Sequence, residues 1–251
     1  CTDVDCVTIT QPNELIAVAV SQNATCYHAC NGTASVTASG GTGSYSYIWS
    51  NGSTATTITG LCAGQYCVTV YDANQCSDVA CVSVGQPDTL YVTFIKHGVT
   101  CNGGNDGWID ITPVGGTAPY SYVWSNGATT QDIYNLTSGG YCVTVTDAHG
   151  CTYLRCFAIL QPPPLTVTKT KHNVNCYGGN DGWIDITVNG GSPGYTYHWS
   201  NGATTQDISG LTAGNYCVTV TDSHGCTKKK CCTITQPTQL IATATSTNVT
   251  C

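Results

Sequence analysis

Short runs in which apolar and polar residues alternate, separated by turn residues, dominate this chain. In its middle third such runs lie at residues 90–100, 107–114, 120–125, 128–136, 139–146 and 152–160, with Asn-Gly, Gly-Gly and Asp-Ala-His-Gly between them. An alternation with a period of two residues, bounded by such turns, predicts β-strands. We expect six strands in each structural repeat and assign them, in chain order, as A, B, C, C′, F and G.

The pattern recurs every 75 residues, as shown by Trp49, Trp124 and Trp199 and by the YCVTV cysteines Cys67, Cys142 and Cys217. A fixed period of this kind is the signature of tandem domains. Each repeat ends at Gln-Pro, where proline stops a strand. We expect residues 1–25 to hold the last strand, G, of a preceding repeat and the first strand of the next. Repeats 1, 2 and 3 follow at 26–86, 87–161 and 162–236, and residues 237–251 form the first strand of a following repeat.

Each repeat carries marks of an immunoglobulin-like β-sandwich. A tryptophan lies on the third strand, and the segment LTSGGYCVTV around Tyr141 is typical of a tyrosine corner. The fold class we predict is therefore all-β, a tandem array of disulfide-stapled immunoglobulin-like sandwiches, with another small sandwich topology as the alternative.

Composition narrows the class of protein. The 251 residues include 18 cysteines, only 21 fully charged side chains with a net charge of -7, and no methionine. So many cysteines, without the close CxxC pairs of a zinc ribbon, indicate disulfides and a secreted, extracellular or cell-surface location. No run of 18 apolar residues predicts a membrane span, and no basic patch favours nucleic acid.

A family resemblance rests on one extended motif. The pattern C-x-G-x-x-D-G, GG-x-x-x-Y-x-Y-x-W-S-N-G, I-x-x-L-x-x-G-x-Y-C-V-T-V-x-D-x-x-G-C and Q-P runs through repeats 2 and 3. It resembles the SprB repeat of large surface adhesins and other secreted proteins of gliding bacteria. Repeat 1 departs from it, because residues 27–34 replace GGNDGWI and Gln75 replaces the turn glycine. The resemblance implies adhesion or filament roles and supplies no catalytic residue.

Cysteine pairing is predicted from the expected topology. In the hairpin of strands F and G, Cys142 lies opposite Cys156, and the same register gives Cys67–Cys81 and Cys217–Cys231. If the end of strand A and the F–G turn lie at one end of a sandwich, a second set of bonds follows. These are Cys26–Cys76, Cys101–Cys151 and Cys176–Cys226.

Three cysteines lie outside the periodic classes. Cys232 aligns with inward positions and should be a buried free thiol. The same topology places Cys30 and Cys62 at opposite ends of repeat 1, too far apart to bond within one repeat.

The sequence disfavours metal and catalytic chemistry. His97 and His149 could join Cys101 and Cys151 in a zinc site, but repeat 1 keeps both cysteines while Gln22 and Asn74 replace the histidines. Asp106, Asp110 and Asp147 could be calcium ligands or catalytic carboxylates, but we interpret them as turn residues. No GxSxG, HExxH or phosphate-binding loop occurs. We expect no enzyme activity and no cofactor.

Two kinds of surface position could carry a further role. Trp108 and Trp183 should face outward at the start of strand B, as a packing surface or as a platform for a surface glycan. Possible glycosylation positions are the sequon residues Asn23, Asn51 and Asn135, and Thr89 in an Asp-Thr-Leu motif.

The leading functional hypothesis is a structural rod, stalk or filament, whose partners are neighbouring repeats or identical chains. A carbohydrate-binding module that uses Trp108 and Trp183 is the alternative. Residues 1–26 match 226–251 at 16 of 26 positions, so we expect a longer array with a three-repeat cycle. The repeats of such an array would be joined either in one covalent chain or as separate subunits, each of which completes a neighbour's sandwich with a terminal strand.

Overall fold

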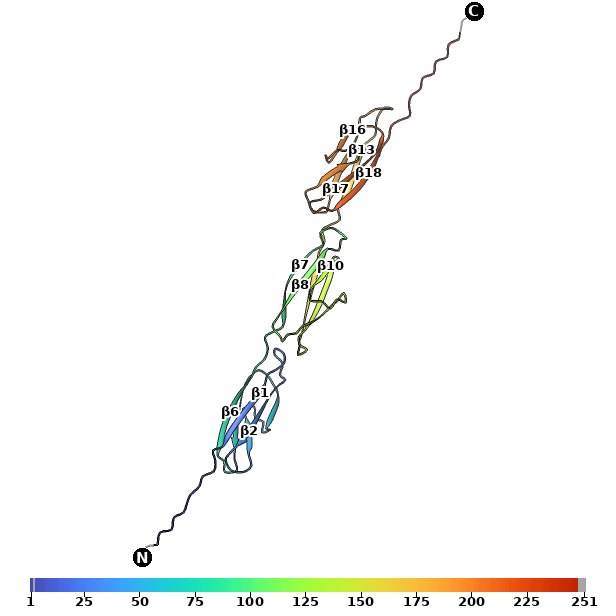
Figure 1. Cartoon of the computed structure of the whole chain (residues 1–251). Helices are drawn as coiled ribbons and strands as arrows, with labels where there is room; N and C mark the ends of the chain where they lie inside the picture. The colour runs from blue at the N-terminus through green and yellow to red at the C-terminus, as the bar shows by residue number, and fades with distance from the viewer. Residues whose placement is uncertain (2, 248–251) are drawn as a thin grey trace, which may run out of the picture. The chain divides into compact units, whose positions relative to one another are not determined.

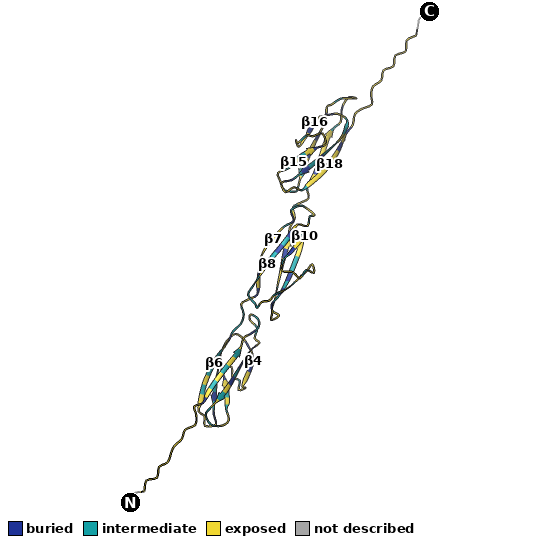
Figure 2. Cartoon of the chain, in the orientation of Figure 1, coloured by how far each residue is buried: buried dark blue, intermediate teal, exposed yellow. Residues whose placement is uncertain are grey.

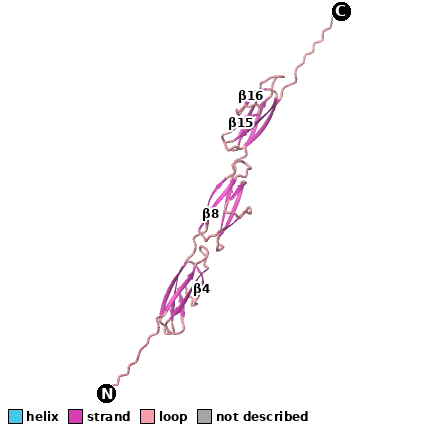
Figure 3. Cartoon of the chain, in the orientation of Figure 1, coloured by secondary structure: helices cyan, strands magenta, loops and turns pink. Residues whose placement is uncertain are grey.

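The computed structural model describes residues 1 and 3–247, which form 18 strands and no helix (Figure 3). Each of the three 75-residue repeats contributes six strands and two three-stranded antiparallel sheets. The strands of repeat 1 are β1 (Ile16–Gln22), β2 (Gly32–Ser39), β3 (Ser46–Trp49), β4 (Thr57–Leu61), β5 (Gly64–Tyr71) and β6 (Ser77–Val84).

The other two repeats reproduce this order, and Figure 1 labels some of the strands of each repeat. Repeat 2 has β7 (Tyr91–His97), β8 (Gly107–Val114), β9 (Ser121–Trp124), β10 (Ile133–Leu136), β11 (Gly139–Thr146) and β12 (Thr152–Ile159). Repeat 3 has β13 (Thr166–His172), β14 (Gly182–Asn189), β15 (Thr196–Trp199), β16 (Ile208–Leu211), β17 (Gly214–Thr221) and β18 (Thr227–Ile234).

The chain divides into two compact units, and the division runs through repeat 2. Unit 1 comprises Cys1–Phe94, Ile111–Gln131 and Cys142–Cys156, and unit 2 comprises Ile95–Asp110, Asp132–Tyr141 and Phe157–Cys251. Unit 1 thus contains repeat 1 and most of the β12-β11-β9 sheet, and unit 2 contains repeat 3 and part of the β10-β8-β7 sheet.

The strand order is that of an immunoglobulin-like sandwich. In repeat 1 the sheets are β1-β2-β4 and β3-β5-β6, which correspond to strands A-B-E and C-F-G. Repeats 2 and 3 have the same two sheets. The predicted fold class is confirmed, whereas the assignment of the fourth strand as C′ is wrong, because β4, β10 and β16 pair with strand B as strand E does.

This correction fixes the direction of every later strand. Strand E runs parallel to strand A, so F returns to the end of the sandwich where A begins, and G runs beside A in the same direction. The A–G contacts prove it, because Ser21 Oγ donates to Ser83 O and Ala24 N donates to Gly85 O. We call the end where strand A begins the leading end of a repeat, and the opposite end the trailing end. The F–G turn lies at the leading end.

The core of each sandwich is built from the apolar positions of the alternating pattern (Figure 2). In repeat 3 the cluster is centred on Trp199, which is 1% exposed, and includes Ile184, Ile186, Val218 and Val220. The indole N–H of Trp199 donates to the carbonyl of Thr205 at 2.9 Å, so the one polar atom of this side chain is satisfied. Repeat 1 has the equivalent cluster around Trp49.

A tyrosine corner closes the E–F connection in all three repeats, as the sequence predicts. The hydroxyl of Tyr141 donates to the carbonyl of Thr137 at 3.0 Å, and the tyrosines of repeats 1 and 3 make the same bond.

Cys232 is buried at 3% exposure and bonds to no other cysteine in the described part of the chain. This confirms the prediction that Cys232 is a buried free thiol.

We predict that replacement of Trp199 by alanine lowers the free energy of unfolding by about 3–5 kcal/mol, because it empties the centre of a packed core. The matched control is Trp183→Ala in the same sandwich, where the indole is 40% exposed and the loss should stay below about 1 kcal/mol. Denaturant unfolding followed by circular dichroism measures both. Equal losses would contradict the assignment of the core.

Candidate functional site

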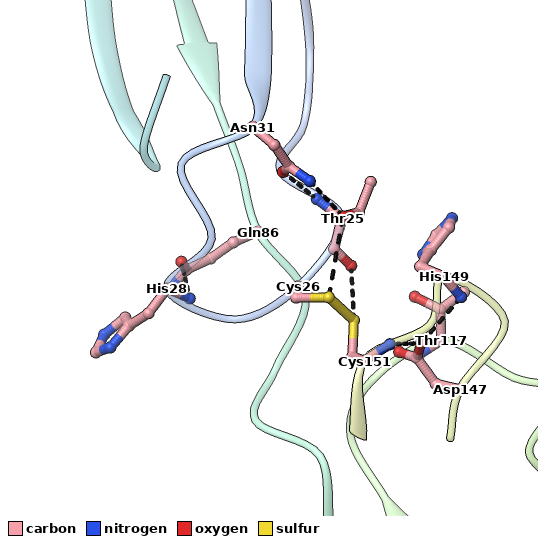
Figure 4. Close-up of a disulfide and its surroundings, with 9 residues drawn as sticks. All are labelled: Thr25, Cys26, His28, Asn31, Gln86, Thr117, Asp147, His149 and Cys151. Carbon is pink, nitrogen blue, oxygen red and sulfur yellow. Dashed lines mark hydrogen bonds between the residues drawn. A yellow bond between two sulfur atoms is a disulfide. The ribbon is translucent and has the colours of Figure 1, made fainter. Parts of the chain in front are cut away.

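The most distinctive chemistry of this chain lies where one repeat meets the next. In unit 1, Cys26 of repeat 1 forms a disulfide with Cys151 of repeat 2, with Cα atoms 5.7 Å apart (Figure 4). In unit 2, Cys101 of repeat 2 forms the equivalent bond with Cys226 of repeat 3, with Cα atoms 5.6 Å apart. Both bonds join residues 125 positions apart.

These bonds replace the pairings Cys26–Cys76, Cys101–Cys151 and Cys176–Cys226 that the sequence analysis predicted, and those pairings are wrong. The reason is the direction of strand F. Cys26 follows strand A at the trailing end of its repeat, whereas Cys76 follows the F–G turn at the leading end. A cysteine at a trailing end therefore meets the leading-end cysteine of the next repeat, and Cys76 and Cys176 remain exposed thiols.

A buried aspartate holds each leading-end cysteine in place. In unit 1, Asp147 Oδ1 accepts hydrogen bonds from the backbone N–H groups of His149 and Cys151, both at 2.9 Å, and Oδ2 accepts one from Thr117 at 2.9 Å (Figure 4). The backbone N–H of Asp147 also donates to the carbonyl of Cys151. Asp147 is a turn residue, as the sequence predicts, and these bonds fix the position of the cysteine that follows the turn.

The same geometry occurs at Asp72 in repeat 1 and Asp222 in repeat 3. Backbone hydrogen bonds, that from Ser192 foremost, hold the pKa of Asp222 below its usual value against the opposing effect of burial, with further help from Cys226 and His224. This carboxylate is therefore ionised in the folded protein at neutral pH and serves as an anchor of the junction.

Each leading end also forms a depression, which we call the socket. The sockets of repeats 2 and 3 are lined in part by the turn after strand A of the preceding repeat, which we call the plug. The plug residues at the socket are Cys26 and Tyr27 in unit 1 and Cys101 and Asn102 in unit 2. Equivalent positions line the two sockets: Pro87, Leu90, Gly116 and Cys151 in repeat 2, and Pro162, Leu165, Gly191 and Cys226 in repeat 3.

A glycine pair shapes the socket wall. Gly190 and Gly191 both have positive φ, and a Cβ on Gly190 would lie 2.1 Å from the carbonyl oxygen of Pro164. The N–H of Gly191 donates to the carbonyl of Pro163 at 2.9 Å. Only glycine permits both the left-handed conformation and this close approach, so the GG motif ties strand B to the linker that enters the repeat.

The remaining disulfides lie within single repeats. Cys67–Cys81, Cys142–Cys156 and Cys217–Cys231 join strands F and G at the register the sequence indicates. Cys30–Cys62 also forms, contrary to the prediction that these cysteines lie at opposite ends. Strand B begins and strand E ends at the trailing end, where Gly32 pairs with Leu61, so the two cysteines are neighbours. The wrong junction pairings and the wrong expectation for Cys30 and Cys62 thus have the same cause, which is the assignment of the fourth strand as C′ instead of E.

A zinc site at His97, His149, Cys101 and Cys151 is not formed, since each of the two cysteines bonds to a cysteine of another repeat. Within the described residues, no group of three or more His, Cys, Asp or Glu side chains is arranged to hold a metal ion.

Asp106 accepts a hydrogen bond from the backbone N–H of Thr100 at 2.9 Å and so shapes the plug of repeat 2.

The outer tryptophans lie against histidines of strand A. The rings of His172 and Trp183 stack with centroids 6.0 Å apart at an interplanar angle of 13°, and His97 and Trp108 do the same at 6.1 Å and 18°. In repeat 1 the corresponding cross-strand pair is Gln22 and Thr33. One face of each indole is thus next to an imidazole of its own repeat.

The possible glycosylation positions occupy different surroundings. Asn23 accepts a hydrogen bond from Gly85, and Asn51 accepts one from Ser53. Asn135 has a positive φ in β10, and Thr89 is exposed beside the socket of repeat 2.

Cys1 and Cys6 are exposed free thiols, while Cys251 lies outside the described residues.

The strand order and the disulfides together define a tandem immunoglobulin-like repeat protein, and its many disulfides indicate an extracellular or surface location. The family model of the SprB repeat matches the chain three times, at residues 18–54, 94–129 and 168–204. Three segments of the chain therefore match the SprB repeat, and the resemblance found in the sequence is confirmed. No helix in the described residues meets the length and apolarity needed to cross a membrane.

Among solved structures, the chain is similar to the N-terminal eight immunoglobulin domains of a Down syndrome cell adhesion molecule. The identity is 11%, the TM-score is 0.41, and the match covers 84% of this chain and 40% of that one. It is also similar to the amphioxus IgVJ-C2 molecule, with 18% identity, a TM-score of 0.25, and coverage of 58% and 96%. No curated protein matches the sequence.

We predict that acid destabilises the junction turns through their aspartates. Because the folded-state pKa of Asp222 lies below that of the unfolded chain, its contribution is present above about pH 4 and is lost as the pH falls through the folded value. Asp222→Asn should therefore melt at a lower temperature than the parent at pH 7, and the gap should close toward pH 2. Melting curves across this range test it, and a gap that stays constant would contradict the role of the charge.

Proposed function

We propose that this chain is a load-bearing part of an extracellular rod, stalk or filament, of the kind that holds an adhesive element away from a cell. The observation that carries the proposal is the overlap of the two junction disulfides. Cys26–Cys151 and Cys101–Cys226 each span 125 residues, and both span the segment from Cys101 to Cys151. The chain is thereby connected along more than one covalent route.

The overlap limits how far the chain can extend under tension. Without these bonds, the 200 residues from Cys26 to Cys226 would extend to roughly 700 Å when unfolded, at about 3.5 Å per residue. With them, the shortest covalent route contains only the 75 residues from Cys26 to Cys101 and the bond to Cys226, or roughly 260 Å. A second route of the same length runs through Cys151. Two parallel routes share the load.

This design suits a structural protein better than a catalyst or a small-molecule binder. The buried aspartates fix the positions of the bonded cysteines, and the glycine pairs shape the sockets that the plugs enter. The partners that fit it are neighbouring repeats and identical chains in a fibre. The exposed sites at Asn51, Asn135 and Thr89 offer positions for glycans on the surface of such a fibre, in keeping with a bacterial surface glycoprotein.

We predict that a single cut in the backbone leaves the chain in one covalent piece. A protease site is inserted after Gly127, in an exposed turn with open space around it. After cleavage the protein should keep its full mass on a denaturing, non-reducing gel, and should separate into two fragments only after reduction.

Matched variants make this test specific. Cys26→Ser or Cys101→Ser alone should leave the fragments joined, because the other disulfide still spans the cut. The double variant should release them. Release by either single variant would contradict the doubly connected chain and with it the proposed function.

A carbohydrate-binding module is the second candidate, and the observation in its favour is the 40% exposure of Trp183. Its free indole face is a surface on which a sugar ring can stack. We expect Trp183→Ala to leave binding to a glycan array unchanged, because the stacked His172 and the absence of such a pair in repeat 1 favour a packing role. Loss of a reproducible glycan signal in this variant, with the melting curve preserved, would establish the binding module instead.

A further inference from the structure

The two exposed thiols Cys76 and Cys176 occupy the two complementary positions of a junction. Cys76 is equivalent to Cys151 and Cys226, which lie in sockets, and Cys176 is equivalent to Cys26 and Cys101, which lie on plugs. Among the described cysteines, repeat 1 thus has a socket cysteine without a partner, and repeat 3 has a plug cysteine without one.

The socket of repeat 1 is built in the same way as the two that are filled. A depression at its leading end is lined at the positions equivalent to those of repeat 3, and no plug residue contributes to it. These positions are Pro12, Leu15, Gly41, Asp72, Cys76 and Ser77, against Pro162, Leu165, Gly191, Asp222, Cys226 and Thr227.

The backbone of Cys76 is fixed in the conformation that the bonded cysteines adopt. Asp72 Oδ1 accepts the N–H of Cys76 at 2.9 Å, and the N–H of Asp72 donates to the carbonyl of Cys76 at 3.0 Å. The corresponding distances for Asp222 and Cys226 are the same, 2.9 and 3.0 Å. Cys76 is therefore presented for a bond.

The plug of repeat 3 is equally preformed. The N–H of Gly178 donates to Gln236 Oε1 at 2.9 Å, and that of Gly179 donates to the carbonyl of Cys176 at 3.0 Å. In repeat 2 the matching bonds involve Gly103 with Gln161, and Gly104 with Cys101. The difference lies in the burial of the cysteine, because Cys26 and Cys101 are half-buried in their junctions, whereas Cys176 is exposed.

Charge also favours a joint between these two ends. The socket of repeat 1 contains Glu14 and Asp78, where the socket of repeat 3 has Pro164 and Lys228. The trailing end of repeat 3 carries Lys171 in the depression next to its plug. Opposite charges at facing ends steer the encounter and disfavour the pairing of two like ends.

We propose that a second copy of this chain docks its repeat 1 socket onto the repeat 3 plug of the first, and that Cys176 bonds to Cys76 of the second copy. This inference rests on the proposed function, because it continues the doubly connected array from one chain to the next. The partner surface on each copy is the end already built for a neighbour, and the contact is head to tail, so that it generates a filament and not a closed pair.

The bond requires an oxidant, which a small-molecule disulfide such as oxidised glutathione supplies. One cysteine thiolate attacks the disulfide and releases one molecule of glutathione as its thiol, leaving a mixed disulfide on the protein. The thiolate of the other cysteine then attacks the protein sulfur and releases the second glutathione. The two protein thiols are oxidised by two electrons, which reduce one oxidised glutathione to two thiols.

The experiment uses the 251-residue chain with Cys1, Cys6 and Cys251 replaced by serine, so that Cys76 and Cys176 are its accessible free thiols. In a glutathione redox buffer it should form a ladder of covalent oligomers on a non-reducing gel. Mass spectrometry of the digest should identify a peptide that joins Cys76 to Cys176.

Two further variants in the same background separate a specific joint from random oxidation. Cys76→Ser and Cys176→Ser should each remain monomeric alone, and an equimolar mixture of the two should give a dimer and no longer species. Dimers of either variant alone, equal cross-linking in every combination, or a parent that stays monomeric at concentrations near 100 μM would each overturn the proposal.

The outcome is independent of the test of the proposed function. The single-cut experiment depends on Cys26–Cys151 and Cys101–Cys226, neither of which is changed here. If the cut chain stays joined while the ladder fails to form, the load-bearing role within one chain stands and only the joint between copies is wrong.

Discussion

The structure depends on one constraint: the F–G turn of each repeat lies at the end where the chain enters that repeat. The turn aspartate, with three backbone N–H donors around its carboxylate, fixes the position of the following cysteine at that end. Because strand A leaves its own cysteine at the opposite end, no repeat can close this pair by itself. The disulfide therefore joins two neighbouring repeats. The sockets, plugs and glycine pairs form the surfaces on which the two repeats meet.

Repeat 1 shows how much of the motif can vary while this constraint is kept. The sequence of its plug differs from that of the other two, and Asn31 stands where they have Asp106 and Asp181. Yet Asn31 accepts the same backbone bond, from Thr25 at 3.0 Å. Cys30–Cys62 adds a staple at the trailing end. The plug conformation is therefore preserved with different residues, which is consistent with selection for the position of Cys26.

Most of the fold could be predicted from the sequence, because strand periodicity, the 75-residue repeat and the tyrosine corner are all local signals. The F–G disulfides were equally accessible, since a hairpin register follows from the turn. The junction disulfides could not be predicted in this way, because the strand that follows Trp124 was assigned to the wrong sheet. Residues 128–136 read as one strand that returns beside C, whereas the observed strand β10 begins only at Ile133 and belongs to the other sheet. That crossover reverses strands F and G, and the hydrophobic pattern does not encode which sheet a strand joins.

The two classes of disulfide also differ in when they can form. The F–G bonds join residues 14 apart, and the junction bonds join residues 125 apart, so closing the longer loop in an unfolded chain costs about 2 kcal/mol more in entropy. Hairpin bonds can thus form early, as each repeat is made, while a junction bond waits for two folded neighbours to present their cysteines. Oxidation at a junction therefore reports that both neighbouring repeats are folded, because a misfolded repeat would leave the cysteines of that junction unpaired.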